Sequence, residues 1–270
     1  MSFSFLSWNV EHFKGGAERL ARVAAHIRGQ NPDIFGLLEV ENVSVLQLMQ
    51  NEFPDYTFGI TDGPESMEIL VGCRTAKFAQ SVFTQKREFK AYNPALRPGA
   101  MLSVRLDAEW HNLLFLHTDS GTDAAAFGNR FEMFDHVWRM KKALDNMAQA
   151  QKLIVLGDLN TMGLFYPTSA NSNSRVAAPD EIGTIGKQAG RRNMALLPKT
   201  EGLTFNNGTL QANLDHVLAS DTIQFAPQGA DPQGNAALVA VRGWNQLAGA
   251  AREAFIGEIS DHSSLFASVA

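Results

Sequence analysis

Apolar residues recur along the first third of the chain with two periods, one typical of strands and one typical of helices. The aromatic-rich segment Phe3–Asn9 predicts a strand, and the apolar run Ile34–Glu39 predicts a second, buried strand. Between them, apolar residues return every three or four positions, which predicts a helix over Ala17–Arg28. Asn31-Pro32-Asp33 ends that pattern.

The rest of the chain predicts mostly short strands with two further helices. The helices are expected at Val43–Phe53 and Phe127–Met147, and the stripe Phe127, Phe131, Phe134 and Trp138 predicts a core-facing side for the second. Gly243–Phe255 fits a short helix or a loop. Strands are expected at Tyr56–Ile60, Glu68–Arg74, Met101–Leu106, Leu113–Thr118, Lys152–Gly157, Leu214–Ala219, Ala237–Val241 and Leu265–Val269.

The segment Thr161–Gly202 shows little periodicity and is rich in Gly, Pro, Ser and Asn, so we expect a long loop, with one short helix as the alternative. No internal repeat or charge block marks a boundary, which predicts a single domain over residues 1–270. Strands and helices are mixed without strict alternation. This pattern predicts an α/β fold with two packed sheets flanked by helices.

Composition narrows the classes of partner. The formal net charge of −5 weakens any interpretation as a protein that coats DNA or RNA, although a bound cation and local basic residues would still admit a nuclease. The single cysteine, Cys73, allows no intrachain disulfide and lies in an apolar run typical of a buried strand. The start of the chain lacks a signal-peptide pattern and no segment predicts a membrane span, so we expect a cytoplasmic protein. The oligomeric state is not indicated.

Polar residues gather where the predicted strands end. The preceding apolar run anchors the backbone, so each polar side chain can project into a cleft. Five such clusters are Trp8-Asn9, Leu38-Glu39, Leu116-His117-Thr118, Gly157-Asp158-Leu159-Asn160 and Ser260-Asp261-His262, and a sixth, Leu214-Asp215-His216, opens a strand.

The cluster after Lys152–Gly157 has a spacing that suits a site. Residues two apart in extended backbone point the same way, so Asp158 and Asn160 share a face while Leu159 turns toward the core. Gly157 permits close approach of another backbone or a tight exit. An Asx-type turn after a strand would explain the same residues.

Two other clusters are also open to two interpretations. Glu39 is either a helix-capping group or a metal ligand, with Glu41 as the competing carboxylate. Asp261 and His262 could combine metal ligation with proton transfer, or could form a helix cap or an exposed turn. His117 alone fits a core or strand-edge histidine.

Five of these motifs together resemble a known superfamily. Ser7-Trp-Asn-Val10, Gly36-Leu-Leu-Glu-Val40, Gly157-Asp-Leu-Asn160, Leu214-Asp-His-Val217 and Ser260-Asp-His262 follow the order and rough spacing of the endonuclease/exonuclease/phosphatase superfamily of deoxyribonuclease I-like metal-dependent phosphoesterases. The resemblance runs from Ser7 to the C-terminus. It implies a four-layer α/β sandwich of two mostly antiparallel sheets flanked by helices, with the site at one end.

The resemblance also implies a role for each matching residue on the metal side. Glu39 matches the principal metal carboxylate, Asp261 a second metal-side carboxylate, and Asn9 the amide that helps position the metal or phosphate. Asp158 and Asn160 match the pair that holds the attacking water and the phosphate. Oxygen ligands suit Mg²⁺, with Mn²⁺ as the alternative, and the scattered histidines do not have zinc-site spacing.

Proton transfer and substrate binding are assigned in the same way. His262 matches the catalytic histidine, and Asp215 matches the acid that orients it. His117 matches a histidine that faces the leaving group or a phosphate oxygen. Arg97 resembles an arginine that contacts phosphate, although an exposed loop arginine before Pro98 would have the same sequence.

Some positions depart from the pattern of the superfamily. Leu38 stands where a Gln is usual, Phe115 where an Asn is frequent, and His216 where an aromatic residue is common. The segment Thr161–Gly202 also holds groups that could bind phosphate or a base, or could be solvated or anchor the segment. These are Arg175, Lys187, Arg191, Arg192, Phe165 and Tyr166.

The resemblance therefore predicts a metal-dependent hydrolase of phosphodiester bonds, with nucleic acid among the candidate substrates. One alternative is a phosphomonoesterase or phospholipase-like hydrolase of a small phosphoester, which the acidic charge mildly favours. Another is a non-catalytic binding module that keeps the fold. The filled principal positions speak against this last alternative.

Overall fold

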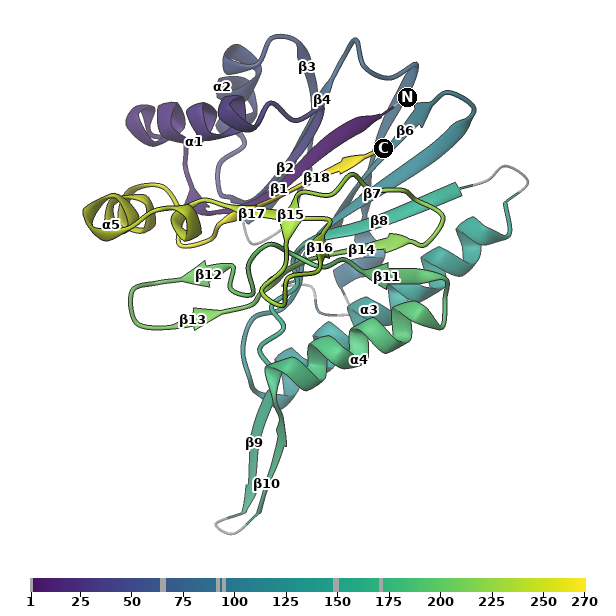
Figure 1. The fold of residues 1–270 in the computed structure, drawn as a ribbon, viewed down its shortest axis with the longest axis vertical. Helices are drawn as coiled ribbons and strands as arrows, with labels where there is room; N and C mark the ends of the chain where they lie inside the picture. Colours follow the sequence, from purple (N-terminus) through teal and green to yellow (C-terminus); the bar gives the residue numbers. More distant parts are fainter. Residues whose placement is uncertain (1, 64–66, 91–92, 94–95, 148–150, 170–171) are drawn as a thin grey trace.

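Two six-stranded sheets pack face to face, with helices on both outer sides (Figure 1). The computed structural model describes residues 2–63, 67–90, 93, 96–147, 151–169 and 172–270. Within these residues, each sheet is antiparallel except for one parallel pair, β1–β2 in the first sheet and β7–β8 in the second. The predicted four-layer sandwich of two mostly antiparallel sheets is confirmed.

The first sheet has the strand order β17-β18-β1-β2-β4-β3. Its strands are β1 (Phe3–Phe13), β2 (Ile34–Val40), β3 (Tyr56–Ile60), β4 (Glu68–Arg74), β17 (Ala240–Arg242) and β18 (Ser264–Val269). Helices α1 (Ala17–Gln30), α2 (Ser44–Glu52) and α5 (Gly249–Glu258) lie on its outer side. Helix α1 carries the chain from β1 to its parallel neighbour β2.

The second sheet has the strand order β11-β14-β8-β7-β6-β5. Its strands are β5 (Gln80–Lys86), β6 (Gly99–Leu106), β7 (Glu109–His117), β8 (Gln151–Asp158), β11 (Met194–Leu196) and β14 (Asp215–Ser220). Helices α3 (Ala124–Asp145) and α4 (Ala178–Gly190) cover its outer side (Figure 1). Helix α3 makes the crossover between the parallel strands β7 and β8.

Short hairpins and 3₁₀ turns complete the described part of the chain. The hairpin β9–β10 projects away from the sheets (Figure 1). The short elements are β9 (Leu164–Ser169), β10 (Ser172–Val176), β12 (Phe205–Asn206), β13 (Gln211–Ala212), β15 (Gly229–Ala230), β16 (Ala236–Ala237), η1 (Arg87–Lys90) and η2 (Trp244–Gln246). No helix in the described ranges is both long and apolar enough to cross a membrane.

Alternation along the strands divides the buried side chains into three apolar layers. Phe5 of β1 and Ile34 of β2 belong to the layer between the sheets, together with Phe115 of β7. Their sequence neighbours Leu6 and Phe35 point the other way, into the layer beneath α1 and α2. A third layer lies between the second sheet and helices α3 and α4. Burial on both faces explains why these strands are apolar almost throughout.

Two glycines allow close approach that a side chain would block. A Cβ on Gly36 would lie 2.2 Å from Cδ1 of Phe115, so the ring of β7 packs directly on the backbone of β2 in the other sheet. A Cβ on Gly157 would lie 2.0 Å from the carbonyl oxygen of Leu116 on the neighbouring strand. Gly157 also has φ +140°, which favours glycine. The sequence prediction of close approach at Gly157 is confirmed.

The expected loop over Thr161–Gly202 is the main error in the predicted elements. The segment contains the hairpin β9–β10, the 13-residue helix α4 and strand β11, while residues 170 and 171 lie outside the described part. The sequence did not predict α4 because three of its residues are glycines, which have a low helix propensity. The start signal was present, because Pro179 stands at the first turn with Asp180 and Glu181.

Two smaller differences have physical causes. Strand β5 was not predicted, because it is an edge strand with no fully buried residue and so lacks a clear apolar face. The core-facing stripe on α3 was wrong at Phe131, which is 70% exposed, although Phe134 and Trp138 are buried. Phe131 lines a cavity between α3 and α4, together with Ile185, so its ring is not packed into the core.

Buried neutral histidines predict a loss of stability in acid. Burial, and then the charge of Lys152, lower the pKa of His111 from 6.5 to about 4. The unfolded chain therefore binds this proton more readily than the folded chain, and stability falls as the pH drops from about 6.5 toward 4. His111→Phe keeps an aromatic ring against Phe3 and cannot ionise.

We expect this variant to lose roughly 1 kcal/mol less unfolding free energy than the wild type between pH 7 and pH 5. Urea denaturation at the two pH values measures the difference. An equal loss in both proteins would show that His111 does not contribute to acid sensitivity.

Candidate active site

The parallel strand pairs deliver four predicted site residues to one end of the sandwich. Asn9 and Glu39 lie toward the carboxyl ends of β1 and β2, and His117 and Asp158 are the last residues of β7 and β8. Parallel neighbours end at the same edge of a sheet, and His117 pairs with Asp158 in the register. The face-to-face packing then brings the two edges together.

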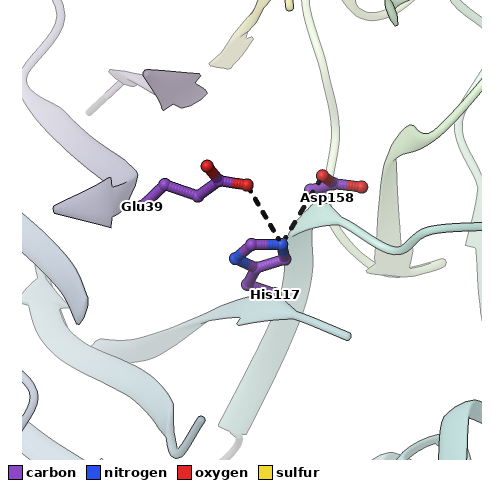
Figure 2. A group of neighbouring side chains, drawn as sticks. All are labelled: Glu39, His117 and Asp158. Atoms are coloured by element: carbon purple, nitrogen blue, oxygen red, sulfur yellow. Dashed lines mark ion pairs between the residues drawn. The ribbon is translucent and has the colours of Figure 1, made fainter. Parts of the chain in front are cut away.

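A carboxylate–histidine group forms where these edges meet (Figure 2). Nε2 of His117 lies 3.6 Å from Oε1 of Glu39 and 3.7 Å from Oδ2 of Asp158. Asn9 bridges the two acids, because its Nδ2 donates to Glu39 Oε1 at 2.9 Å and to Asp158 Oδ2 at 3.0 Å. The ligand atoms of Glu39, His117 and Asp158 all lie within 4.8 Å of one another, a spacing that could hold a metal ion.

A histidine–aspartate pair adjoins this group. His262 Nδ1 donates to Asp215 Oδ2 at 2.8 Å, while its Nε2 lies 3.6 Å from Asp158 Oδ2. Asp215 opens β14 and pairs with Asp158 of β8 across the sheet, so the same register places both acids around the imidazole. The ring of Phe205 lies 5.0 Å from the ring of His262 and covers one side of it.

Burial and the crowding of carboxylates shift the pKa values of this site in different directions. Burial is the largest cause of the raised pKa of Asp158, and the neighbouring charge of Asp215 adds to it. Burial would lower the pKa of His262, but the carboxylates of Asp215 and Asp158 outweigh it and raise that pKa. Burial, and then the charge of Arg97, hold the pKa of His117 well below 6.5. His117 is therefore neutral and suited to act as a ligand, whereas His262 is suited to hold a proton.

The backbone around Asp158 and Asn160 forms a tight exit from β8. The Asn160 N–H donates to Asp158 Oδ1 at 3.0 Å, which is the hydrogen bond of an Asx turn. The same two residues therefore form the turn and line the candidate site. Asn160 has φ +42° and its Nδ2 donates to the carbonyl of Thr118. Glu39 also has a positive φ, +63°, so two predicted site residues hold a backbone conformation that non-glycine residues rarely adopt.

Asp261 and Arg97 line the same cavity, of about 550 Å³, without joining the carboxylate–histidine group. Asp261 Oδ1 lies 3.8 Å from His262 Nε2, and burial raises the pKa of Asp261 to about 6. Arg97 lies near His117, and its Nε is buried without a hydrogen-bond partner among the described residues. The cavity wall also includes Phe205 and Leu210 of the β12–β13 hairpin.

Other residues singled out in the sequence lie elsewhere. His216 is buried and faces Thr161 Oγ1 at 2.8 Å, away from the cavity lining. Cys73 is buried, and burial raises the pKa of its thiol to about 12. In the described part of the chain, none of the four cations singled out in the 161–202 segment lines the cavity. Arg175 lies over the ring of Phe165 and Arg192 over that of Trp138.

Several supporting residues were not predicted from the sequence. Trp8 Nε1 donates to the carbonyl of His262 at 2.9 Å, and Ser260 Oγ donates to the carbonyl of Asn9 at 2.7 Å. Thr204 Oγ1 accepts the backbone N–H of Asp215, and buried Lys199 donates to the Asp215 carbonyl. Trp8 and Ser260 stood inside recognised motifs, whereas no sequence signal marked Thr204 or Lys199.

Comparison with known proteins agrees with this geometry. The profile of the Endonuclease/Exonuclease/phosphatase family matches residues 6–262. A search of curated protein sequences gives no significant match.

Three solved structures share the fold at low sequence identity. D. rerio TDP2 complexed with a single-strand DNA product is 14% identical with a TM-score of 0.62, over 100% of this chain and 99% of that one. A mannosyl-6-phosphatase of Bacteroides thetaiotaomicron is 17% identical with a TM-score of 0.63, over 99% of both chains. ANGEL2, a 2′,3′-cyclic phosphatase in complex with adenosine-2′,3′-vanadate, is 11% identical with a TM-score of 0.64, over 100% of this chain and 95% of that one.

The chain belongs to the endonuclease/exonuclease/phosphatase family, because the family profile covers nearly its whole length. The two-sheet sandwich is also the fold of the solved structures that this chain resembles. The protein is accordingly a metal-dependent hydrolase of phosphoester bonds.

Proposed function

We propose that the protein is a phosphodiesterase that uses Mg²⁺, or Mn²⁺ in its place, held between Glu39 and Asp158. The convergence of these two carboxylates with His117 carries the proposal. Asp158 is buried and its pKa is raised, so the ionised acid lacks sufficient positive charge nearby. A divalent cation would supply that charge, and both acids offer the oxygen ligands that it prefers.

The residues around the cation would each have a distinct task. Asn9 holds the two acids at a fixed separation through its Nδ2, and Asp261 on the cavity wall would be a third carboxylate on the metal side. His117 is neutral and faces the same point, where it can bind the cation or a phosphate oxygen. The bound cation would withdraw charge from the phosphoryl oxygens, which gather negative charge in the transition state.

His262 would move the proton of the reaction. Its Nδ1 is fixed by Asp215, so Nε2 is the atom left to exchange a proton with water or with the leaving oxygen. Asp158 and Asn160 would hold the attacking water and the phosphate. Arg97 would bind a phosphoryl oxygen, a role that its unpartnered buried Nε and its place on the cavity wall support.

The charge of the cavity favours a diester over a monoester. Its lining includes the carboxylates of Glu11, Glu39, Asp158 and Asp261, against two cationic groups, Arg97 and His262, whose pKa the carboxylates raise. A phosphodiester carries one negative charge at neutral pH, whereas a monoester approaches two. The acidic lining therefore repels the monoester more strongly. Nucleic acid, a polymer of diesters, is the substrate class that we propose first.

The second candidate is a hydrolase of a small phosphoester. The net charge of −5 favours it, because no general attraction to a polyanion is expected. Both candidates use the same metal and proton-transfer residues, so they differ only in the size and charge of the substrate that the cavity binds.

Removing the imidazole of His262 tests the catalytic step. His262→Ala should lower kcat by ~10²–10⁴, because a positioned acid–base group is lost. Steady-state hydrolysis of bis(p-nitrophenyl) phosphate measures the effect, and circular dichroism checks the fold. His111→Phe, which alters a histidine outside the cavity lining, is the control and should keep wild-type kcat. An active His262→Ala enzyme would remove this residue from the mechanism.

Removing one charge from the proposed metal site tests ligation. Glu39→Gln should raise the Mg²⁺ concentration at half-maximal rate by about tenfold or more, because a carboxylate ligand is lost. The matched control is Glu52→Gln, since Glu52 pairs with Arg28 of α1 and does not line the cavity. The same Mg²⁺ dependence in both variants would contradict ligation by Glu39.

Substrate charge provides a third test. We expect kcat/KM for bis(p-nitrophenyl) phosphate to exceed that for p-nitrophenyl phosphate, because the acidic lining disfavours the second charge. Nicking of supercoiled plasmid DNA under the same conditions separates the nuclease from the small-substrate candidate. Faster hydrolysis of the monoester would overturn the preference for diesters.

A further inference from the structure

A buried ion pair lies beside the active site and takes no part in the chemistry described above. Arg130 of α3 is 0% exposed, and its guanidinium pairs with Glu181 of α4. Nε donates to Glu181 Oε1 at 2.8 Å, and Nη2 donates to Glu181 Oε2 at 3.2 Å. The two residues are 51 positions apart and belong to different helices. The pair therefore fixes α4, and the hairpin before it, to α3.

The remaining donors of Arg130 hold two loops. Nη1 donates to the carbonyls of Asp119 at 3.2 Å and Gly121 at 2.7 Å, in the loop after β7. Nη2 donates to the carbonyl of Gly163 at 2.7 Å, in the loop after β8. Together with Glu181, these acceptors match the five N–H groups of a guanidinium, so the buried charge is fully satisfied.

The same two loops carry part of the active-site wall. Ser120, between Asp119 and Gly121, lines the cavity, and so does Met162, next to Gly163. Asn160 links the loops, because its Nδ2 donates to the carbonyl of Thr118. Glu181 Oε2 also accepts the N–H of Gly163 at 2.7 Å, which fixes the second loop from the other side.

We propose that Arg130, paired with Glu181, is a positioning residue that sets the two loops in register and thereby aims Asn160 into the active site. A guanidinium is planar and rigid, so the loop carbonyls bound to it have a fixed relative position that a lysine could not maintain. The proposal rests on the proposed phosphodiesterase function. In addition, it states that the position of Asn160, which is proposed to bind phosphate and water, depends on the ion pair between Arg130 and Glu181 of α4.

Three variants separate positioning from stability. Arg130→Lys keeps the charge and loses the planar fork, and Arg130→Met also loses the charge. The double variant Arg130→Met with Glu181→Leu replaces the buried pair by apolar side chains, which commonly restores stability. In all three, kcat for bis(p-nitrophenyl) phosphate should fall by about tenfold to a hundredfold, because the loop carbonyls lose their common donor.

The Mg²⁺ concentration at half-maximal rate should change much less than kcat in the same variants, since the loosened loop reaches the metal ligands only through the Asn160 N–H bond to Asp158. Glu39 and Asp158 are anchored on strands, and Arg130 does not contact them. The matched control is Arg139→Met, an arginine on the same helix with an exposed ion pair to Asp135, which should keep wild-type kcat. Hydrogen exchange of residues 118–123 and 159–164 should speed up in the three variants and not in the control.

The double variant decides the question. A merely structural role predicts that kcat returns with the melting temperature, and wild-type kcat in the stable double variant would overturn the proposal. If a variant at Arg130 fails to fold, Glu181→Gln, which removes the charge at nearly constant size, provides the same comparison. If the wild type hydrolyses no phosphoester, the proposed function fails. Unchanged hydrogen exchange in the two loops would still refute positioning by Arg130.

Discussion

The site depends on one topological constraint: among the described strands, each mostly antiparallel sheet contains a single parallel pair. A parallel pair needs a crossover, and α1 and α3 make those crossovers on the outer faces of the sandwich. In each pair, both strands therefore deliver their last residues to one edge. Because the sheets are packed face to face, the two edges adjoin and the residues on β1, β2, β7 and β8 meet. Four segments spread over 150 residues become one cluster.

The cluster gathers more negative charge than its buried surroundings can stabilise. Asn9 bridges Glu39 and Asp158, but an amide carries no charge to compensate two acids. His262 compensates part of it, and its raised pKa is the result. The neutral state of His117 leaves the space between the carboxylates without a fixed cation. The fold thus holds acids at close range, an arrangement that a bound metal ion would stabilise.

The sequence predicted the sandwich and the members of the cluster because both depend on local patterns. Strand ends are marked by polar residues after apolar runs, and the motifs around Glu39, Asp158, Asp215 and His262 stand at such ends. The hydrogen bond between Asp215 and His262 also followed from the family resemblance. The inclusion of His117 with Glu39 and Asp158 did not, because it depends on how far apart the two sheets stand.

What the sequence did not predict depends on contacts between distant segments. Arg130 and Glu181 have no local pattern that marks them as partners, and each resembles an ordinary helix-surface residue. Helix α4 was obscured by its glycines, which lower helix propensity while tertiary packing of Ile185 and Ala189 supports the helix. The exposure of Phe131 likewise depends on the cavity left between α3 and α4. Thr204 and Lys199 support Asp215 through hydrogen bonds between their side chains and its backbone, and no sequence motif marks such contacts.

The contact between Phe115 and Gly36 has a consequence for the width of the site. The ring of Phe115 rests on bare backbone and acts as a spacer between the two sheets. His117 follows two residues later on one strand, and Glu39 follows three residues later on the other. The thickness of the Phe115 ring therefore sets the distance between the two strands that carry Glu39 and His117, and so the space for a cation between them. A bulkier residue at position 36 would move the two sheets apart at the active-site end, and a smaller residue at position 115 would let them move closer.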